Sequence, residues 1–353
     1  MPLDSGYCHD PTKGHIVSYN NLDYAQCVQR LIDPFGRPIE YVRLSVTDRC
    51  DLRCNYCIPK GFKDFEEPED WLTFAEIERV IGAFGRLGVT RIRLTGGEPL
   101  VRRDLPALAA RLATLPGIED LSLSTNATRL VKHAVALREA GVSRINASLD
   151  SLRADRFKNI TQGKLEKVLA GLMAAKDAGF MPIKINMVVM AGVNDDEVED
   201  MVDFCIENDF TLRFIETMPM GTTGVSAREH YVNLQVVRKQ LEKRFDLIPG
   251  VMPGGGPARY VRVAGTELRI GFITPISQHF CETCNRVRLA VDGTIYLCLG
   301  QNDRLELRPL LRAGASDQDL EQAILDAIAL KPERHEFNEK PEQVLRFMST
   351  TGG

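Results

Sequence analysis

A regular alternation of short β-rich runs with amphipathic helical stretches is the strongest constraint on the fold. Six runs are rich in Val, Ile, Leu and Thr, and a stretch with helical periodicity follows each of them. The runs cover residues 41–46, 91–95, 120–125, 144–149, 183–189 and 212–216. Several helical stretches end at a glycine (Gly88, Gly141, Gly179), which is typical of a helix C-cap. The pattern predicts an α/β fold with a parallel sheet, either barrel-like or open and doubly wound.

The Gly/Pro-rich stretch 249–258 interrupts this alternation. Beyond it, two hairpin patterns turn at AGT and DG, and a last helix is expected over about 317–330. Residues 1–38 show no sustained periodicity. We therefore expect three parts: an irregular N-terminal lead-in over 1–38, a barrel over 39–248, and a small β-containing C-terminal unit over 249–353.

Composition limits the possible functions and the compartment. The 353 residues carry a formal net charge of −4, which argues against broad binding to nucleic acid or a membrane surface. The first residues contain no apolar segment, so we expect neither a signal peptide nor a transit peptide. No stretch approaches the length of a membrane span. We expect a cytoplasmic protein, whose cysteines are better metal or catalytic candidates than disulfide candidates.

Three cysteines are crowded into the loop after the first predicted strand. Cys50, Cys54 and Cys57 have the spacing C-x3-C-x2-C. A structural zinc would need a fourth, distant ligand, whereas a [4Fe-4S] cluster held by three thiolates leaves one iron open. The second strand ends in TGGEP at the same edge, where paired glycines let the backbone approach a ligand and Glu98 could accept hydrogen bonds from an ammonium group.

A second group has the spacing C-x2-C-x13-C and consists of Cys281, Cys284 and Cys298. Its spacing alone leaves two alternatives open, a zinc ribbon with His279 as fourth ligand and an iron–sulfur cluster with an iron open for substrate. The remaining cysteines, Cys8, Cys27 and Cys205, stand alone, and we interpret them as incidental.

Positive side chains lie beside the second group and inside the predicted strands. The segment Asn285-Arg286-Val287-Arg288 follows Cys284 directly, and its guanidinium groups match phosphate and purine-edge acceptors. Arg43 and Lys184 interrupt otherwise apolar strands. Because buried cations need partners, an anionic substrate inside the barrel is one explanation, and an outward-facing position is the alternative.

The CDLRCNYC loop, followed one βα unit later by TGGEP, resembles the radical S-adenosylmethionine enzymes. The resemblance implies a partial barrel of six βα units in which S-adenosylmethionine binds the open iron and is cleaved to a 5′-deoxyadenosyl radical. The further motifs RLTGGEPLVRRDL, NASLDSL, KINMV, RFIETMPMG, CETCNRVRL and the terminal Gly-Gly resemble the GTP 3′,8-cyclase family. These lyases act first in molybdenum cofactor biosynthesis. This resemblance runs from about residue 33 to residue 353.

The resemblance implies a role for each matching residue. Two [4Fe-4S] clusters would be held by Cys50, Cys54 and Cys57 and by Cys281, Cys284 and Cys298. The S-adenosylmethionine site would be lined by Tyr56, Gly97, Ser148 and Met218. Contacts with GTP would come from Arg43, Arg93, Ser124, Lys184, Arg286, Val287 and Arg288. Catalysis would also depend on Arg43 and on a tail, Gly352 and Gly353, that reaches into the active site.

The resemblance also implies a reaction and partners. GTP would become 3′,8-cyclo-7,8-dihydro-GTP, which a cyclic pyranopterin monophosphate synthase would receive. Flavodoxin or ferredoxin would supply electrons, and the chain would form a homodimer. One departure is LSTNA, where the family commonly reads TTNG, so that Ala127 replaces a turn glycine and Ser124 replaces a threonine. The alternatives are a radical enzyme that modifies a peptide with an auxiliary cluster, and a non-enzymatic zinc-binding module.

Overall fold

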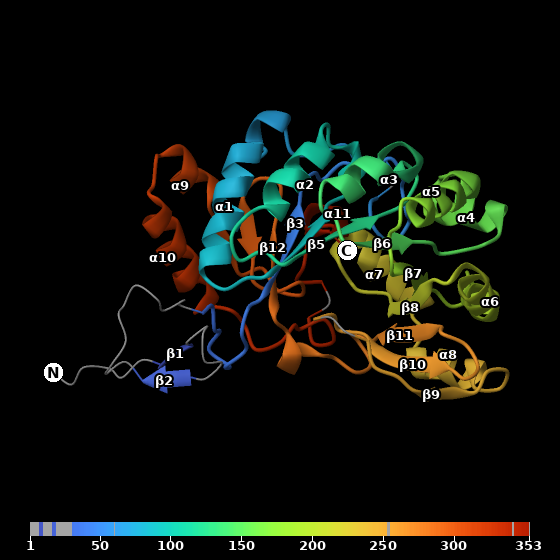
Figure 1. Cartoon of the computed structure of the whole chain (residues 1–353). Helices are drawn as coiled ribbons and strands as arrows, with labels where there is room; N and C mark the ends of the chain where they lie inside the picture. Colours follow the sequence, from blue (N-terminus) through green and yellow to red (C-terminus); the bar gives the residue numbers. More distant parts are fainter. Residues whose placement is uncertain are drawn as a thin grey trace.

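The structure is a computed structural model that describes residues 7–9, 16–18, 30–59, 61–252, 255–340 and 342–352 (Figure 1). Six parallel strands form its centre and are neighbours in chain order. They are β3 (Tyr41–Ser45), β4 (Arg91–Thr95), β5 (Asp120–Thr125), β6 (Arg144–Ser148), β7 (Ile183–Val189) and β8 (Thr211–Glu216). The predicted parallel sheet of six strand–helix units is confirmed.

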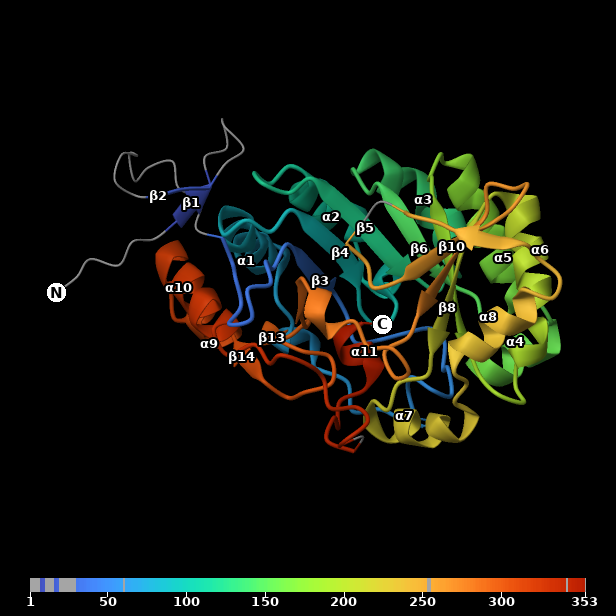
Figure 2. The ribbon, with the colours of Figure 1, turned by 90° about the horizontal axis from the view of Figure 1, so that it is seen from below.

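Helices connect these strands and lie outside the curve of the sheet (Figure 2). They are α1 (Phe74–Arg86), α2 (Leu105–Ala113), α3 (Leu130–Glu139), α4 (Ala154–Thr161), α5 (Leu165–Asp177) and α6 (Val198–Asn208). Gly88, Gly141 and Gly179 follow three of these helices with positive φ, as the sequence predicts. Alternate strand residues such as Val42 and Leu44 are fully buried in the core. Their neighbours in sequence therefore face the inside of the curve.

The two predicted hairpins of the C-terminal part extend opposite edges of this same sheet. At one edge β11 (Arg269–Ile273) pairs in parallel with β8, and the antiparallel strands β10 (Arg259–Val263) and β9 (Leu247–Pro249) follow outward. At the other edge β12 (Arg286–Leu289) pairs in parallel with β3, followed by β13 (Thr294–Tyr296) and β14 (Arg304–Glu306). The connection from β11 to β12 therefore runs from one edge of the curved sheet to the other, and it carries Cys281 and Cys284.

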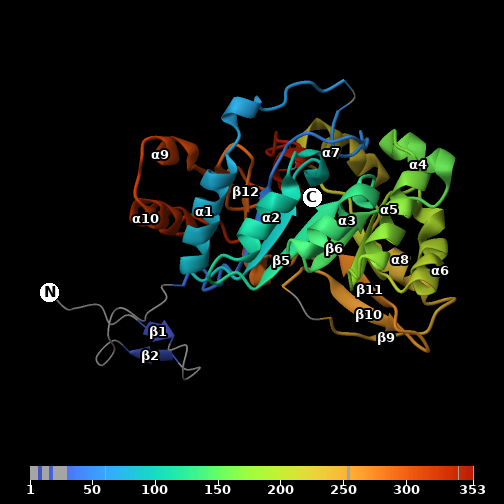
Figure 3. The ribbon, with the colours of Figure 1, turned by 45° about the horizontal axis from the view of Figure 1, so that its top comes forward.

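The remaining helices lie at the edges of the sheet and within its curve. They are α7 (Gly221–Ala227), α8 (Leu234–Leu241), α9 (Arg308–Arg312), α10 (Asp317–Ile328) and α11 (Met348–Thr351). Helix α10 is the predicted last long helix, and it packs on α1 (Figure 3). The short α11 contacts β3 and lies within the curve of the sheet (Figure 2). The end of the chain is thereby brought to the strands that carry the first cysteine loop.

Most of the N-terminal lead-in lies outside the described residues, including Cys27. Its described part contains the antiparallel pair β1 (Tyr7–His9) and β2 (Ile16–Ser18), with Cys8 in β1. In the part of the chain that the structure describes, no helix combines the length and apolar character that a membrane crossing requires.

Candidate active site

The first cysteine trio borders a cavity at the carboxyl ends of the central strands. Every residue that the sequence assigns to S-adenosylmethionine also lines this cavity: Tyr56, Gly97, Ser148 and Met218. Tyr56, Gly97 and Met218 come from the loops after β3, β4 and β8, and Ser148 is the last residue of β6, so the four are far apart in the chain. The parallel sheet brings them to one edge.

The loops after β3 and β4 are hydrogen-bonded to each other through their backbones. The Gly97 amide donates to the Thr47 carbonyl over 2.8 Å, and the Glu98 amide donates to the Arg49 carbonyl over 2.8 Å. A Cβ atom on Gly97 would lie 2.4 Å from the Arg49 carbonyl oxygen. Glycine is therefore required at this position so that the two loops can approach each other closely.

Glu98 has a different use from the one that the sequence suggested. Its carboxylate accepts hydrogen bonds from the amides of Leu100 and Asn126 and from the Thr125 hydroxyl, at 2.6–3.0 Å. Its side chain is fully buried and is not among those that line the cavity. It joins the loops after β4 and β5 rather than presenting an acceptor to a ligand.

The three thiols of the first trio are suited to a metal cluster. Burial raises the pKa of Cys50 and of Cys57 to about 12, and it raises the pKa of Cys54 as well. A buried thiol becomes a thiolate only when a cation or metal compensates its charge. In the described residues no group of three or more His, Cys, Asp or Glu side chains is arranged to hold a single metal ion. Three sulfurs around one cavity fit a larger cluster.

The Tyr56 hydroxyl is hydrogen-bonded to a buried carboxylate, Asp150, which the sequence reasoning missed. It donates to Asp150 Oδ2 over 2.7 Å, and the Val188 amide donates to Asp150 Oδ1 over 2.9 Å. Asp150 is 2% exposed, and burial raises its pKa to about 6. It lies two residues beyond Ser148 and lines the same cavity. An acid after a strand is common in sequences, so only its burial distinguishes it.

A second cavity adjoins the first and is bordered by the second cysteine trio, Cys281, Cys284 and Cys298. Asn186, Ile215, Met218 and Met348 line both cavities. His279, the ligand of the zinc alternative, is not among the residues lining this second cavity. The two cysteine trios thus face two neighbouring spaces within one curved sheet.

Arginine side chains form a row across the second cavity. Strand register makes Arg288, Arg43 and Arg93 direct neighbours on β12, β3 and β4. Within the described part of the chain, the buried nitrogens that have no hydrogen-bond partner include Nε and Nη2 of Arg43 and Nε of Arg286 and Arg288. Burial lowers the pKa of Arg288 to about 10 and also lowers that of Arg43. Unpaired buried guanidinium groups fit an anionic ligand, since burial of like charges without a partner is unfavourable.

Charges also surround the second trio and hold its loops. The Arg37 guanidinium donates to the Cys281 carbonyl over 2.7 Å, and that of Arg346 donates to the Cys298 carbonyl over 2.9 Å. Although burial acts to raise it, the pKa of Cys284 is lowered by the charges of Lys331 and Arg286, among others. These charges favour the thiolate, which is the form of the side chain that ligates a cluster.

A third cavity continues from the second and is lined by further cations: Arg91, Arg93, Arg144, Lys184 and Arg213. Arg43 and Lys184 both line cavities, so the outward-facing alternative is wrong for each. The sequence reasoning missed Arg91, Arg144 and Arg213. The signal for Arg213 was present, because it interrupts the apolar run of β8 as Arg43 interrupts that of β3.

The other predicted residues lie in several places. Ser124 lines the first cavity, with the cofactor candidates rather than with the arginine row. Val287 is fully buried between Arg286 and Arg288. Gly352 has φ +71°, and an added Cβ would lie 2.3 Å from Thr95, which lines the first cavity. Gly353 lies outside the described residues.

Ala127 confirms that the turn after β5 requires an unusual backbone. Its φ is +65°, a left-handed conformation that favours glycine. The residue is fully buried, and the Thr125 hydroxyl accepts a hydrogen bond from its amide over 3.0 Å. The turn therefore keeps the glycine geometry although the side chain is alanine.

Comparison with known proteins agrees with this geometry. The family model of the Radical SAM superfamily matches residues 44–205, and that of Molybdenum Cofactor Synthesis C matches residues 210–337. A GTP 3′,8-cyclase of Hydrogenovibrio crunogenus is 48% identical over 92% of this chain and 99% of its own length. The chain belongs to the GTP 3′,8-cyclase family. Another member, GTP 3′,8-cyclase 1 of Pseudomonas aeruginosa, is 49% identical over 91% of this chain and 99% of its own length.

Solved structures confirm the fold. Streptococcus suis SuiB bound to S-adenosylmethionine has a TM-score of 0.56 and 15% identity, and the match covers 82% of this chain and 68% of that one. SuiB bound to its precursor peptide SuiA has the same TM-score, with 16% identity over 83% and 65%. The expected partial TIM-like barrel, with six βα units and added C-terminal strands, is thus the fold of a radical SAM protein.

Proposed function

We propose that the chain is a lyase that converts GTP to 3′,8-cyclo-7,8-dihydro-GTP, in the first step of molybdenum cofactor biosynthesis. One observation carries this proposal: two cysteine trios border adjoining cavities, and a row of guanidinium groups crosses the second of them, with buried nitrogens on Arg43 and Arg288 that have no hydrogen-bond partner among the described residues. Membership of the family supports the same activity.

Cys50, Cys54 and Cys57 would hold one [4Fe-4S] cluster, and Cys281, Cys284 and Cys298 would hold the other. The first cluster with S-adenosylmethionine supplies chemistry that removes a hydrogen atom from an unactivated carbon. The chain provides binding, orientation and exclusion of water, because the reactive atom must meet one chosen hydrogen and no other.

The cationic side chains would hold GTP at both ends. The second cavity, with Arg286 and Arg288, would take the guanine end near the second trio. The third cavity, with Lys184 and Arg213, would take the triphosphate. The ribose would then lie near the residues shared by the first and second cavities, such as Asn186. Placing the ribose there would bring it next to the cofactor site.

The peptide-modifying alternative shares the fold, so the fold does not discriminate between the two functions. The cations that line the second and third cavities do, because an extended peptide has no group with the charge of a triphosphate. Homodimer formation, supply of electrons by flavodoxin or ferredoxin, transfer of product to a cyclic pyranopterin monophosphate synthase, and a cytoplasmic location remain parts of the proposal. So does the division into parts over 1–38, 39–248 and 249–353.

The test is anaerobic incubation of iron-loaded protein with GTP, S-adenosylmethionine and dithionite, followed by mass analysis of the nucleotide. We expect a cyclised product that has the same mass as GTP, because the hydrogen lost from C3′ is balanced by the one gained at N7, and that separates from GTP by chromatography, together with 5′-deoxyadenosine. ATP in place of GTP serves as the control and should give no cyclised nucleotide. Protein that contains iron and cleaves S-adenosylmethionine but leaves GTP unchanged would contradict the proposal.

A further inference from the structure

The first cavity differs from its neighbours in the sign of its charge. Its lining contains two acidic side chains, Asp150 and Glu216, and no Lys, Arg or His among the described residues. The second and third cavities are instead lined by arginine and lysine. Two carboxylates in a space without a base require a compensating charge or a full set of hydrogen bonds.

Glu216 has such a set of hydrogen bonds. Its oxygens accept bonds from the amides of Ile276, Ser277 and Leu234 and from the hydroxyls of Ser277 and Tyr231. These contacts tie the end of β8 to the segment that leads to Cys281. The charge of Glu216 is therefore already distributed over protein donors.

Among the described residues, the Asp150 carboxylate has two donors, both neutral: the Tyr56 hydroxyl and the Val188 amide. It is 2% exposed, and no Lys, Arg or His in the described part of the chain stands among the groups that act on it. A buried carboxylate with two neutral donors is left with uncompensated charge. The cavity that it lines is the place from which a cation can reach it.

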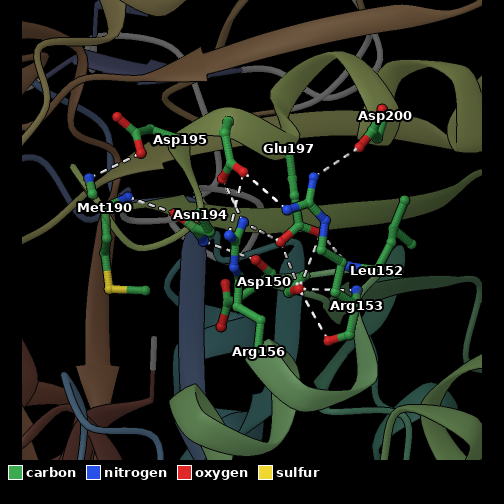
Figure 4. A network of polar contacts seen from close by, with 12 residues as sticks. Asp150, Leu152, Arg153, Arg156, Met190, Asn194, Asp195, Glu197 and Asp200 are labelled. Atoms are coloured by element: carbon green, nitrogen blue, oxygen red, sulfur yellow. Dashed lines mark hydrogen bonds and ion pairs between the residues drawn. The ribbon is translucent and has the colours of Figure 1, made fainter.

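The position of Asp150 is fixed by a polar network behind it (Figure 4). Asn194 Nδ2 donates to the Asp150 carbonyl over 2.8 Å, and Asn194 Oδ1 accepts from the Met190 amide over 2.8 Å. The buried Glu197 carboxylate accepts from the Ser151 hydroxyl over 2.8 Å. These hydrogen bonds hold Asp150 and Ser151 in place, which keeps the Asp150 carboxylate directed toward the cavity. A charge that acts on a ligand has to be held in position in this way.

We propose that Asp150 is the counter-charge for the cationic sulfonium group of S-adenosylmethionine, and that it makes the cavity prefer this cofactor over the neutral thioether S-adenosylhomocysteine. The inference deepens the proposed function and rests on it. Asp150 would also orient Tyr56, since the hydroxyl of that ring is its hydrogen-bond partner. The two roles can be separated, because only the first depends on the charge of the ligand.

The decisive variant is Asp150→Asn in iron-loaded protein, because the amide keeps the size of the side chain and removes its charge. The amide oxygen can still accept from the Val188 amide, and the Tyr56 hydroxyl can turn to accept from the amide NH2 group. Dissociation constants for S-adenosylmethionine and S-adenosylhomocysteine are measured anaerobically by titration calorimetry. We expect S-adenosylmethionine to bind about tenfold more weakly or worse, the scale of one lost ion pair in a partly desolvated site, and S-adenosylhomocysteine to change by less than about twofold.

Tyr56→Phe is the matched control, because it removes the hydroxyl and leaves the carboxylate charge. It should weaken both ligands by similar factors. If Asp150→Asn also weakens both ligands equally, Asp150 merely positions Tyr56 and the charge proposal is wrong. Iron content and the unfolding midpoint identify a variant that has lost its structure.

Wild-type protein gives a second test that needs no variant. Sinefungin carries an ammonium group where S-adenosylmethionine has its sulfonium, so it should bind several-fold more tightly than S-adenosylhomocysteine. Equal affinity for these two ligands would overturn the inference. Failure of the proposed function is a separate result, in which iron-loaded wild-type protein binds S-adenosylmethionine but forms no cyclised nucleotide.

Discussion

Lys184 should take up a proton when a triphosphate binds. It is 7% exposed in the third cavity, and burial, together with the charges of Arg213, Arg144 and Arg93, lowers its pKa to about 7. At pH 8 a group with this pKa is about nine-tenths deprotonated. A triphosphate beside the ammonium group would raise the pKa back toward its ordinary value of 10.5. Binding at pH 8 should therefore carry roughly 0.9 proton into the protein.

The assay is anaerobic titration calorimetry with GTP at pH 8, in several buffers that differ in ionisation enthalpy. The slope of binding enthalpy against ionisation enthalpy gives the number of protons taken up. A terminal phosphate with a pKa of about 6 is already ionised at pH 8, so it contributes little to the slope. At pH 6 Lys184 is itself protonated, and its uptake should fall to about a tenth of a proton.

Two variants separate the charge of Lys184 from its titration. Lys184→Arg should bind GTP without proton uptake at pH 8, because a guanidinium stays protonated there. Lys184→Met should lose the uptake and weaken binding by about 1.5–3 kcal/mol, the usual scale for a hydrogen bond to a charged group. Lys176→Met is the control, because Lys176 is partly exposed and pairs with Asp209.

Proton uptake that persists in Lys184→Met, or that is absent from the wild type, would refute this reasoning.

The same shifted pKa of Lys184 also predicts how the stability of the unliganded protein depends on pH. Between about pH 7 and 10.5 the unfolded chain binds more protons at this side chain than the folded one. The contribution of Lys184 to the free energy of unfolding should therefore rise with pH in that interval, and Lys184→Met should remove the rise.

Three further predictions test the two trios, the tail and the buried acid. Cys54→Ala should abolish cleavage of S-adenosylmethionine. Cys284→Ala should retain part of this cleavage but lose the cyclised product. If product analysis finds cyclisation intact in Cys284→Ala, a second substrate site is excluded. Gly352→Ala should displace the tail, because its methyl group would lie 2.3 Å from Thr95 at φ +71°. We expect at least about a tenfold loss of product with unchanged iron content, and full activity would show that the tail is passive. Asp150→Asn should stabilise the unliganded protein at pH 8 by up to about 3 kcal/mol, since the raised pKa of the acid lowers stability as pH rises from 3.8 to about 6. Denaturant unfolding at pH 4 and pH 8 checks this, and an unchanged pH dependence would contradict it.

The central strands could be predicted within one residue because their pattern is local. A parallel strand covered by helices is a short, mostly apolar run, and the helix after it has its own period. The edge pairings could not be predicted in this way. That β11 joins β8 while β12 joins β3 depends on contacts between residues far apart in the chain, and neither hairpin contains a signal that selects its edge.

In the candidate site, too, some residues could be predicted from local sequence and others depend on the folded structure. Cysteine spacing and a cation inside an apolar strand are visible locally, so both trios, Arg43 and Lys184 could be named from the sequence. Arg213 also interrupts an apolar strand, so the same pattern could have identified it. Asp150 could not be named in this way, because its role depends on its burial and on a cavity lining that contains no Lys, Arg or His among the described residues. The Thr95 contact of Gly352 likewise exists only once the tail has folded back.

The opposite charges of adjoining cavities provide a physical reason why each ligand would enter its own space. A triphosphate in the first cavity would face the Asp150 carboxylate without a cation to offset it, and a sulfonium in the third would face Lys184 and the arginines around it. Like charges about 4 Å apart in a partly desolvated site repel each other by several kcal/mol, so a reversed arrangement of the ligands is disfavoured. The residues that line both the first and the second cavity carry no charge. They are Asn186, Ile215, Met218 and Met348. At this uncharged junction of the first and second cavities, a neutral ribose and the reactive carbon of the cofactor could approach each other without repulsion from either cavity.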